Sequence, residues 1–214
     1  MRKLIVIYDE QEKDEGRDSY IKGIKKQIPD AIISPVGDMV EGAYDKCLVL
    51  KPMDPEIYDS FSEFLKNNPI FDIEGIHTGD LTVTAEAILK TIGKVENKTV
   101  MIINQSNILG KPLAKELIER GANVVSLNSS YEDIENLIIF TKVDILITAT
   151  NNYNFKIDRY VTKDIETKID LSDDLDTGDK IKHLPTIEVL KERLQKWARR
   201  KKRRKKRHQY TKWH

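Results

Sequence analysis

Blocks of apolar residues alternate with amphipathic stretches along most of this chain. Short apolar runs predict buried β-strands at residues 3–8, 47–50, 99–103, 123–127, 143–148 and 167–171. Apolar positions three or four residues apart predict helices at residues 19–27, 55–67, 82–92, 111–120, 131–140 and 186–197. Strands that alternate with helices in this way form mainly parallel sheets with helices on both faces, so the pattern predicts an α/β fold.

The alternation is most regular after Lys98, and the length of 214 residues suits one large domain or two small ones. We place a boundary near Gly79, so that residues 1–79 form an amino-terminal α/β lobe. Residues 80–197 then form a Rossmann-like nucleotide-binding lobe with helices on both faces of its sheet. Residues 198–214 form a basic tail.

The cysteine content and the apolar runs limit the setting in which the protein works. The single cysteine, Cys47, excludes a disulfide framework and favours an intracellular, cytoplasmic protein. It lies inside an apolar run, which favours a buried structural thiol over a nucleophile. No apolar run approaches the roughly 20 residues that a helix needs to cross a bilayer. The amino terminus turns acidic after a short strand and does not have the pattern of a signal peptide.

Charge is distributed very unevenly along the chain. The formal net charge is +1, but ten of the 36 lysines and arginines follow Ala198 and no acid does, so the rest carries 26 cations against 35 acids, or −9. The tail contains nine consecutive cations: Arg199, Arg200, Lys201, Lys202, Arg203, Arg204, Lys205, Lys206 and Arg207. Because like charges at helical spacing repel, we expect the tail to be disordered or only partly helical.

Such a cationic run binds the phosphate backbone of RNA or DNA through counterion release, without reading bases. The aromatic side chains of His208, Tyr210 and Trp213 would add stacking on bases. A nuclear-targeting signal, contact with an anionic membrane or an added expression tag would give the same pattern, so the ligand of the tail stays open.

A polar turn follows the strand predicted at 99–103 and is the candidate binding turn of the second lobe. The helix after it opens with Gly110, Lys111 and Pro112. At such a βα turn, the carboxyl end of the strand and the amino end of the helix face one crevice. Free backbone N–H groups and the positive end of the helix dipole attract phosphate there. The Gly-x-Gly-x-x-Gly fingerprint of dinucleotide sites is absent, since only Gly110 is present.

The amino-acid sequence of this turn resembles one protein family more specifically than the generic glycine fingerprint would. The residues Ser106-Asn-Ile-Leu-Gly-Lys-Pro-Leu-Ala114 closely resemble the cofactor loop of the methylenetetrahydrofolate dehydrogenase/cyclohydrolase family, the bifunctional folate enzymes. Other segments resemble the family in the same order over nearly the whole body of the chain: Leu4–Tyr8, Ser19–Tyr20, Cys47–Met53, Asp72–His77, Thr82–Ile88 and Val143–Thr150.

The resemblance implies an enzyme that oxidises 5,10-methylenetetrahydrofolate by hydride transfer to NADP or NAD and then hydrolyses the methenyl product. It also implies that the first lobe binds folate and that the final helix packs back on that lobe. We further expect a homodimer.

In the family, hydrolysis uses a lysine held by a tyrosine and a neighbouring glutamine. Tyr20 matches the tyrosine, but Ile24 stands where the lysine should be. The remaining candidates beside Tyr20 are Lys25 and Lys51, which lies next to the glutamine position, Leu50. Lys25 could serve only with a local backbone shift, because a residue five positions along a helix points about 140° away. The structural alternative is that Tyr20 simply covers the sheet of the first lobe.

Substrate contacts are also only partly matched. The family anchors the pterin ring with an aspartate, and Glu74 stands at that position with His77 nearby, so both are candidate substrate-binding residues. The alternative for His77 is a hydrogen-bonded structural histidine. The family's late Pro-Gly-Gly-Val-Gly-Pro segment, which touches folate, is missing, and the chain joins across it near His183.

In the second lobe, the resemblance marks five cofactor-binding candidates: Asn104, Gln105, Ser106, Ser129 and Thr150. Gln105 has no charge for an adenosine 2′-phosphate, which an arginine normally holds. The strand at 123–127 is not followed by an acid that would mark a free ribose hydroxyl. The choice between NAD and NADP is therefore open. Asn151 stands where the family usually has glycine and would crowd the nicotinamide end.

Two functions follow from these matches and departures. The favoured one is a shortened, diverged folate dehydrogenase whose cyclohydrolase step is weakened or lost, because hydride transfer needs mostly orientation of cofactor and substrate. The alternative is a catalytically inactive scaffold, a pseudoenzyme, that binds RNA, DNA or a ribonucleoprotein through its tail. No spacing of Cys and His predicts a metal, and no Gly-x-Ser-x-Gly elbow predicts a serine hydrolase.

Overall fold

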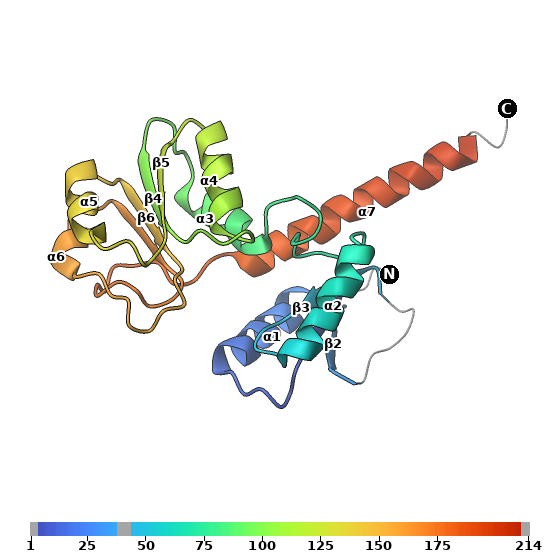
Figure 1. Cartoon of the computed structure of the whole chain (residues 1–214). Helices are drawn as coiled ribbons and strands as arrows, with labels where there is room; N and C mark the ends of the chain where they lie inside the picture. The colour runs from blue at the N-terminus through green and yellow to red at the C-terminus, as the bar shows by residue number, and fades with distance from the viewer. Residues whose placement is uncertain (1–3, 38–43, 211–214) are drawn as a thin grey trace. The chain divides into compact units, whose positions relative to one another are not determined.

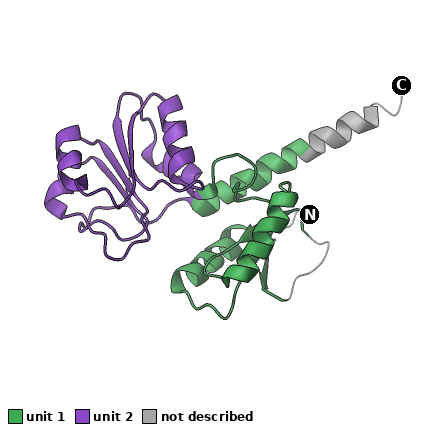
Figure 2. Ribbon diagram, viewed as in Figure 1, with its two compact units in different colours: residues 1–83, 186–214 green, residues 84–185 purple. Residues whose placement is uncertain are grey.

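The computed structural model describes residues 4–37 and 44–210, without the side chains of 201–210. The chain divides into two compact units (Figure 2): residues 1–83 together with 186–214 form unit 1, and residues 84–185 form unit 2. The first cut falls after Val83, a few residues beyond the expected boundary near Gly79. Among the described residues, no helix combines the length and the apolar character needed to cross a membrane.

Unit 1 is built on a three-stranded parallel sheet with the strand order β2-β1-β3 (Figure 1). Its strands are β1 (Leu4–Tyr8), β2 (Ile32–Pro35) and β3 (Lys46–Val49). Its helices are α1 (Glu15–Gln27), α2 (Pro55–Asn67) and α7 (Thr186–Tyr210). Two of these helices begin with a side-chain cap, because Asp14 accepts from Arg17 N and Asp54 accepts from the N–H groups of Glu56 and Ile57.

The core of unit 1 follows from the alternation of side chains along β1. Ile5 and Ile7 join Cys47 and Leu65 in one buried cluster, against which Ile57, Tyr58 and Phe61 of α2 pack. The thiol of Cys47 is buried, as the sequence predicts. On α1, Gly23 permits a close approach to α7, because a Cβ there would lie 2.6 Å from Ile187 Cδ1. The final helix therefore packs within unit 1.

Unit 2 is built on a four-stranded parallel sheet with the strand order β5-β4-β6-β7. Its strands are β4 (Thr99–Ile103), β5 (Asn123–Leu127), β6 (Ile145–Thr148) and β7 (Thr167–Asp170). Its helices are α3 (Val83–Ile92), α4 (Gly110–Glu119), α5 (Ile134–Thr141) and α6 (Arg159–Thr162). Figure 1 shows α3 and α4 on one side of the sheet and α5 and α6 on the other. The predicted α/β class with parallel sheets is confirmed.

Several elements differ from the sequence prediction. Helix α1 begins at Glu15 rather than Ser19, and α5 begins at Ile134 rather than Tyr131. The strand β2 and the one-turn helix α6 were not expected. The larger difference is in α7, which continues to Tyr210 where the sequence predicted a helix to about Trp197 and then a disordered or partly helical tail. Lysine and arginine are good helix formers, and a helix that is already nucleated by packing extends at low cost. In the backbone of α7, these effects outweigh the repulsion between like charges.

Candidate functional site

The turn between β4 and α4 is closed by the side chain of Asn104. Its Oδ1 atom accepts from Ser106 N at 3.0 Å, from Ser106 Oγ at 2.7 Å and from Gly110 N at 3.0 Å. Its Nδ2 atom donates to the carbonyl of Ala149, just after β6, at 2.7 Å. Asn104 therefore joins the end of β4, the start of α4 and the end of β6.

The amino end of α4 is more occupied than the sequence suggested. The N–H of Leu109 donates to Ser106 Oγ at 3.1 Å, the N–H of Gly110 to Asn104, and the N–H of Lys111 to Ser106 O at 3.1 Å. The expectation of free N–H groups is thus wrong for these three residues. Within the described part of the chain, the N–H groups of Asn107 and Ile108 have no hydrogen-bond partner.

The charge around this helix end suits an anion. The first turns of α1, α2, α3, α5 and α7 each contain an acidic residue, whereas that of α4 contains none and includes Lys111. Since the amino end of a helix carries partial positive charge, an acid-free first turn leaves that charge available to a ligand. The polar, acid-free turn therefore fits the pyrophosphate of a dinucleotide.

Gly110 allows α4 to start directly against the end of β4. A Cβ at this position would lie 1.7 Å from Asn104 O and 2.4 Å from its carbonyl carbon, which no side chain can do. In Rossmann-like folds one glycine of the turn has this role of close helix–strand packing. The chain keeps this requirement although the rest of the glycine fingerprint is absent.

The other expected cofactor residues lie on the same edge of the sheet. The register pairs Ile103 with Leu127 on β5 and with Thr148 on β6, so the residues that follow these strands meet at one edge. Gln105 Nε2 donates to Ser126 O at 2.9 Å, and Ser129 lies in the turn after β5. Thr150 follows β6, and its N–H and hydroxyl donate to Asp174 at 3.2 and 2.7 Å.

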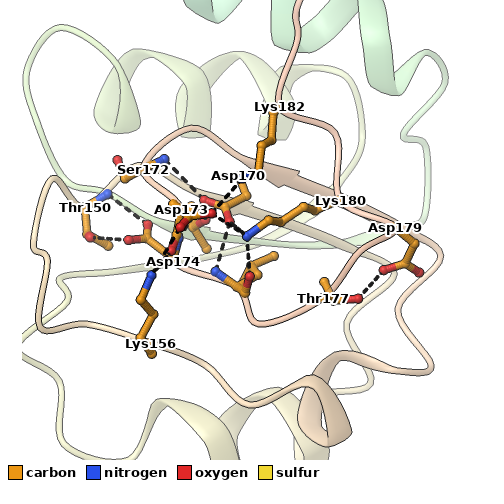
Figure 3. A network of polar contacts seen from close by, with 12 residues as sticks. Thr150, Lys156, Asp170, Ser172, Asp173, Asp174, Thr177, Asp179, Lys180 and Lys182 are labelled. Carbon is orange, nitrogen blue, oxygen red and sulfur yellow. Dashed lines mark hydrogen bonds and ion pairs between the residues drawn. The ribbon is translucent and has the colours of Figure 1, made fainter.

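Thr150 is the outer member of a polar network that closes the end of β7 (Figure 3). The fully buried carboxylate of Asp170 accepts from the N–H groups of Ser172, Asp174 and Leu175. Lys180 Nζ lies 2.8 Å from Asp170 Oδ2 and 2.9 Å from Asp173 Oδ1. Burial alone would raise the pKa of Asp170, but the bonds from Lys180 and from these backbone N–H groups lower it.

In unit 1, the structure brings Tyr20 and Glu74 together. Burial raises the pKa of Tyr20 to about 12, a side-chain hydrogen bond with Thr186 opposes this shift, and the charge of Glu74 adds to it. Burial also raises the pKa of Glu74 to about 7, against the opposing charge of Arg193 and with a further contribution from Asp72. Glu74 is therefore a carboxyl group that changes charge near neutral pH.

The two lysines proposed beside Tyr20 lie in different surroundings. Ile24, at the family's lysine position, is fully buried in the core, and Lys25 is exposed with no hydrogen bond to Tyr20 among the described residues. Lys51 is also exposed, and its Nζ lies 3.8 Å from the ring centroid of Tyr58. The pKa of Tyr58 is raised by burial and by the charge of Glu74. Lys51 is thus linked through Tyr58 to the neighbourhood of Glu74, whereas Lys25 is not.

His77 has structural contacts. Its Nε2 lies 3.2 Å from Ser62 Oγ on α2, and its backbone N–H donates to Asp72 Oδ2 at 2.8 Å. These bonds agree with the alternative of a hydrogen-bonded structural histidine. Among the described residues, no group of three or more His, Cys, Asp or Glu side chains is arranged to hold a metal ion.

The sequence analysis missed Arg193, a central residue of unit 1. From α7, its guanidinium donates to the carbonyls of Ile73, Glu74 and Leu81. The available signal was weak: Arg193 adjoins the apolar stripe of the last helix next to Leu194, where a charged residue needs a buried partner.

A parallel sheet with an anion-suited turn after β4 defines unit 2 as a Rossmann-like nucleotide-binding domain. Residues 82–174 match the family model described as the tetrahydrofolate dehydrogenase/cyclohydrolase, NAD(P)-binding domain. The expected cofactor class, NADP or NAD, is thus confirmed for this domain family. In this domain the chain is similar in sequence to FolD proteins, and it shares their fold, as the resemblance implied.

Curated relatives and solved structures agree with this assignment. The bifunctional protein FolD of Chlorobium luteolum is 28% identical over 166 residues, which cover 67% of this chain and 55% of the relative. That of Nitrosopumilus maritimus is 29% identical over 122 residues, covering 50% and 42%. The chain spans about half the length of the curated relatives it matches.

Two solved structures share the fold at low sequence identity. The Trypanosoma brucei methylenetetrahydrofolate dehydrogenase-cyclohydrolase (FolD), complexed with NADP and an inhibitor, has a TM-score of 0.68 at 17% identity and covers 94% of this chain and 88% of its own. The NAD-dependent 5,10-methylenetetrahydrofolate dehydrogenase of Saccharomyces cerevisiae has a TM-score of 0.64 at 16% identity, with 93% and 87% covered.

Proposed function

We propose that this chain oxidises 5,10-methylenetetrahydrofolate with NADP or NAD and lacks an effective cyclohydrolase step. The observation that carries the proposal is the β4–α4 turn, where Asn104 and Gly110 bring the acid-free end of α4 against the strand. The match of residues 82–174 to an NAD(P)-binding domain supports the same site.

The residues of unit 2 would bind and orient the dinucleotide. The N–H groups of Asn107 and Ile108, together with Lys111, would bind the pyrophosphate. Gln105, Ser129 and Thr150, at the ends of β4, β5 and β6, would line the rest of the cofactor. When bound, the nicotinamide ring accepts a hydride. Unit 1 would contribute Glu74, whose carboxylate accepts hydrogen bonds from the pterin.

The missing lysine is the reason for proposing that hydrolysis is lost. At its position stands Ile24, a fully buried hydrocarbon side chain without an ionisable group. General acid–base catalysis typically contributes a factor of about 10² to 10⁴, and the lysines that α1 does carry, Lys22, Lys25 and Lys26, are all exposed. The methenyl product would therefore persist after hydride transfer.

The test is to mix the full chain with 5,10-methylenetetrahydrofolate and either NADP or NAD, and to follow reduced nicotinamide and the methenyl product separately. We expect reduced cofactor to appear with an equal amount of methenyl product, which decays no faster than it does in buffer. Rapid loss of the methenyl product would show that hydrolysis is intact. Absence of turnover and of calorimetric binding with both cofactors would contradict the oxidoreductase.

A paired set of variants locates the cofactor. Lys111→Gln removes the cation from the first turn of α4, so we expect weaker binding of NADP and NAD. Lys115→Gln removes an exposed cation one turn further on, where the helix dipole has little effect, and serves as the matched control. Equal affinities for both variants would place the pyrophosphate elsewhere.

A second candidate function, a scaffold that binds nucleic acid, rests on the nine consecutive cations of residues 199–207. Binding of RNA or DNA that weakens steeply with salt, and that disappears when residues 199–214 are removed, would support it. Binding that survives this truncation would contradict a role for the tail. The homodimer and the cytoplasmic location complete the proposal, and light scattering and cell fractionation test them.

A further inference from the structure

Arg193 is unusual because a residue of the last helix holds a segment that lies far away in the sequence. Its Nη1 atom donates to Ile73 O at 2.8 Å and to Glu74 O at 2.9 Å, and its Nη2 atom donates to Leu81 O at 2.5 Å. One guanidinium thus binds carbonyls on both sides of the turn that carries Glu74. The rigid fork of an arginine suits this task, because its donors are fixed in one plane.

Asp72 binds backbone N–H groups of the same turn, whereas Arg193 binds its carbonyls. Its carboxylate accepts from Gly75 N at 2.9 Å and from His77 N at 2.8 Å, while Val83 N donates to Glu74 O at 3.1 Å. Gly75 has a φ of +89°, and a Cβ there would lie 2.7 Å from Leu81 O and 3.1 Å from Arg193 Nη1. A glycine is therefore required for Arg193 to reach these carbonyls.

Charged and titratable groups from several elements surround the Glu74 carboxyl. Arg193 from α7 favours its anionic form, whereas Asp72 in the same segment opposes it. The hydroxyls of Tyr20 on α1 and Tyr58 on α2 also interact electrostatically with Glu74. The Arg193 guanidinium is the favourable cationic partner in this group, so it bears directly on the charge of Glu74.

We propose that Arg193 is a positioning residue, which fixes the backbone at Glu74 and favours the ionised form of its carboxyl, the form that accepts hydrogen bonds from a ligand. The ligand, a pterin-type ring with adjacent N–H donors, rests on the proposed function. The link between Arg193 and Glu74 does not depend on the proposed function, since both residues belong to unit 1 and Arg193 donates directly to the Glu74 carbonyl.

The experiment is a carboxyl ¹³C NMR titration of the full chain without ligand, with the Glu74 signal assigned from Glu74→Gln. In the wild type we expect a midpoint at about 7. Arg193→Met removes the opposing charge, so the midpoint should rise. Lys191→Met, an exposed site on the same helix, is the matched control and should leave the midpoint unchanged. An unchanged midpoint in folded Arg193→Met would overturn the proposal.

Arg193→Lys separates charge from geometry and carries the test if Arg193→Met does not fold. It should keep the midpoint near the wild-type value but weaken binding of tetrahydrofolate, because the single nitrogen of an ammonium does not reproduce the geometry of the two guanidinium nitrogens that bind these carbonyls. In Arg193→Met, binding near pH 7 should weaken by up to about tenfold for each pH unit by which the midpoint moves, with a smaller loss at alkaline pH. Wild-type affinity in both variants would contradict the positioning role. If the wild type does not bind tetrahydrofolate but the midpoint shifts, the proposed function fails and the charge effect of Arg193 stands.

Discussion

The sequence identifies Glu74 as a candidate site residue but does not predict the pKa of its carboxyl group. The Asp-Ile-Glu-Gly stretch identified Glu74 through family resemblance, and the structure adds that it is partly buried and interacts electrostatically with Tyr20. Its pKa depends on Arg193, which lies 119 residues later in the chain. A local motif carries no information about such a partner, so the charge of Glu74 near neutral pH could not be predicted from the sequence.

The raised pKa of Glu74 predicts a pH dependence of stability. The group ordinarily titrates at 4.5 and in the folded protein at about 7, so between these values the folded state holds a proton that the unfolded state has released. The contribution of Glu74 to the free energy of unfolding should therefore fall as pH rises from about 4.5 to about 7 and then stay constant. Urea unfolding across this range should show that Glu74→Gln removes this component, whereas Glu63→Gln, at an exposed site, does not. Identical pH profiles for wild type and Glu74→Gln would contradict it.

A second residue-scale prediction concerns Gly110. Gly110→Ala places a methyl group within 1.7 Å of Asn104 O, so the turn must open and the bonds of Asn104 must break. We expect a loss of more than about 2 kcal/mol in the free energy of unfolding, together with weaker NADP binding. Gly178→Ala, in a loop of the same unit with open space around it, is the control and should have little effect. Calorimetry and cofactor titration of both variants measure this difference.

Among the elements, those with strong periodicity were predicted best. The bounds of α2, β4 and β5 agree with the sequence prediction, because each has a clear apolar pattern and sharp polar flanks. Strand β2 was missed because it is short and ends at Pro35, which reads as a turn residue. The candidate cofactor edge was predictable once β4 and β5 were, because parallel strands align their carboxyl ends at one edge of the sheet. The hydrogen-bond network around Asp170 could not be predicted, since it depends on the conformation of the loop after β7.

That network yields a prediction for the loop after β7. Lys180→Met leaves the fully buried Asp170 without its cation, so we expect a loss of about 3–5 kcal/mol in the free energy of unfolding. Lys182→Met removes a partner of the exposed Asp173 and should cost less than about 1 kcal/mol. Chemical denaturation of the two variants compares them directly. Similar small losses would mean that the three backbone N–H bonds are sufficient to hold Asp170.

At the scale of the whole molecule, the chain is divided unevenly between its two units. Unit 2 is one continuous segment inserted into unit 1, which is assembled from two separate pieces (Figure 2). The sequence predicted the return of the last helix only through family resemblance. The apolar stripe of that helix indicates that it packs against something but does not identify the partner.

This arrangement predicts that residues 84–185 fold by themselves. The segment contains its complete four-stranded sheet and a core cluster that includes Met101, Ile138 and Leu146. Residues 1–83 alone lack the buried Val189 and Leu190 of α7 and should not fold cooperatively. Thermal unfolding followed by circular dichroism tests both fragments. A cooperative transition in residues 1–83 would show that α7 is dispensable.

The dependence of the Glu74 turn on Arg193 has a consequence for biosynthesis. The ribosome synthesises all of unit 2 before α7. Unit 2 can therefore fold during translation, whereas unit 1 cannot be completed until α7 has been synthesised. Until Arg193 leaves the exit tunnel, the segment around Glu74 lacks its contacts to Arg193, and a nascent chain stalled before that point would contain a folded unit 2 and an incomplete unit 1.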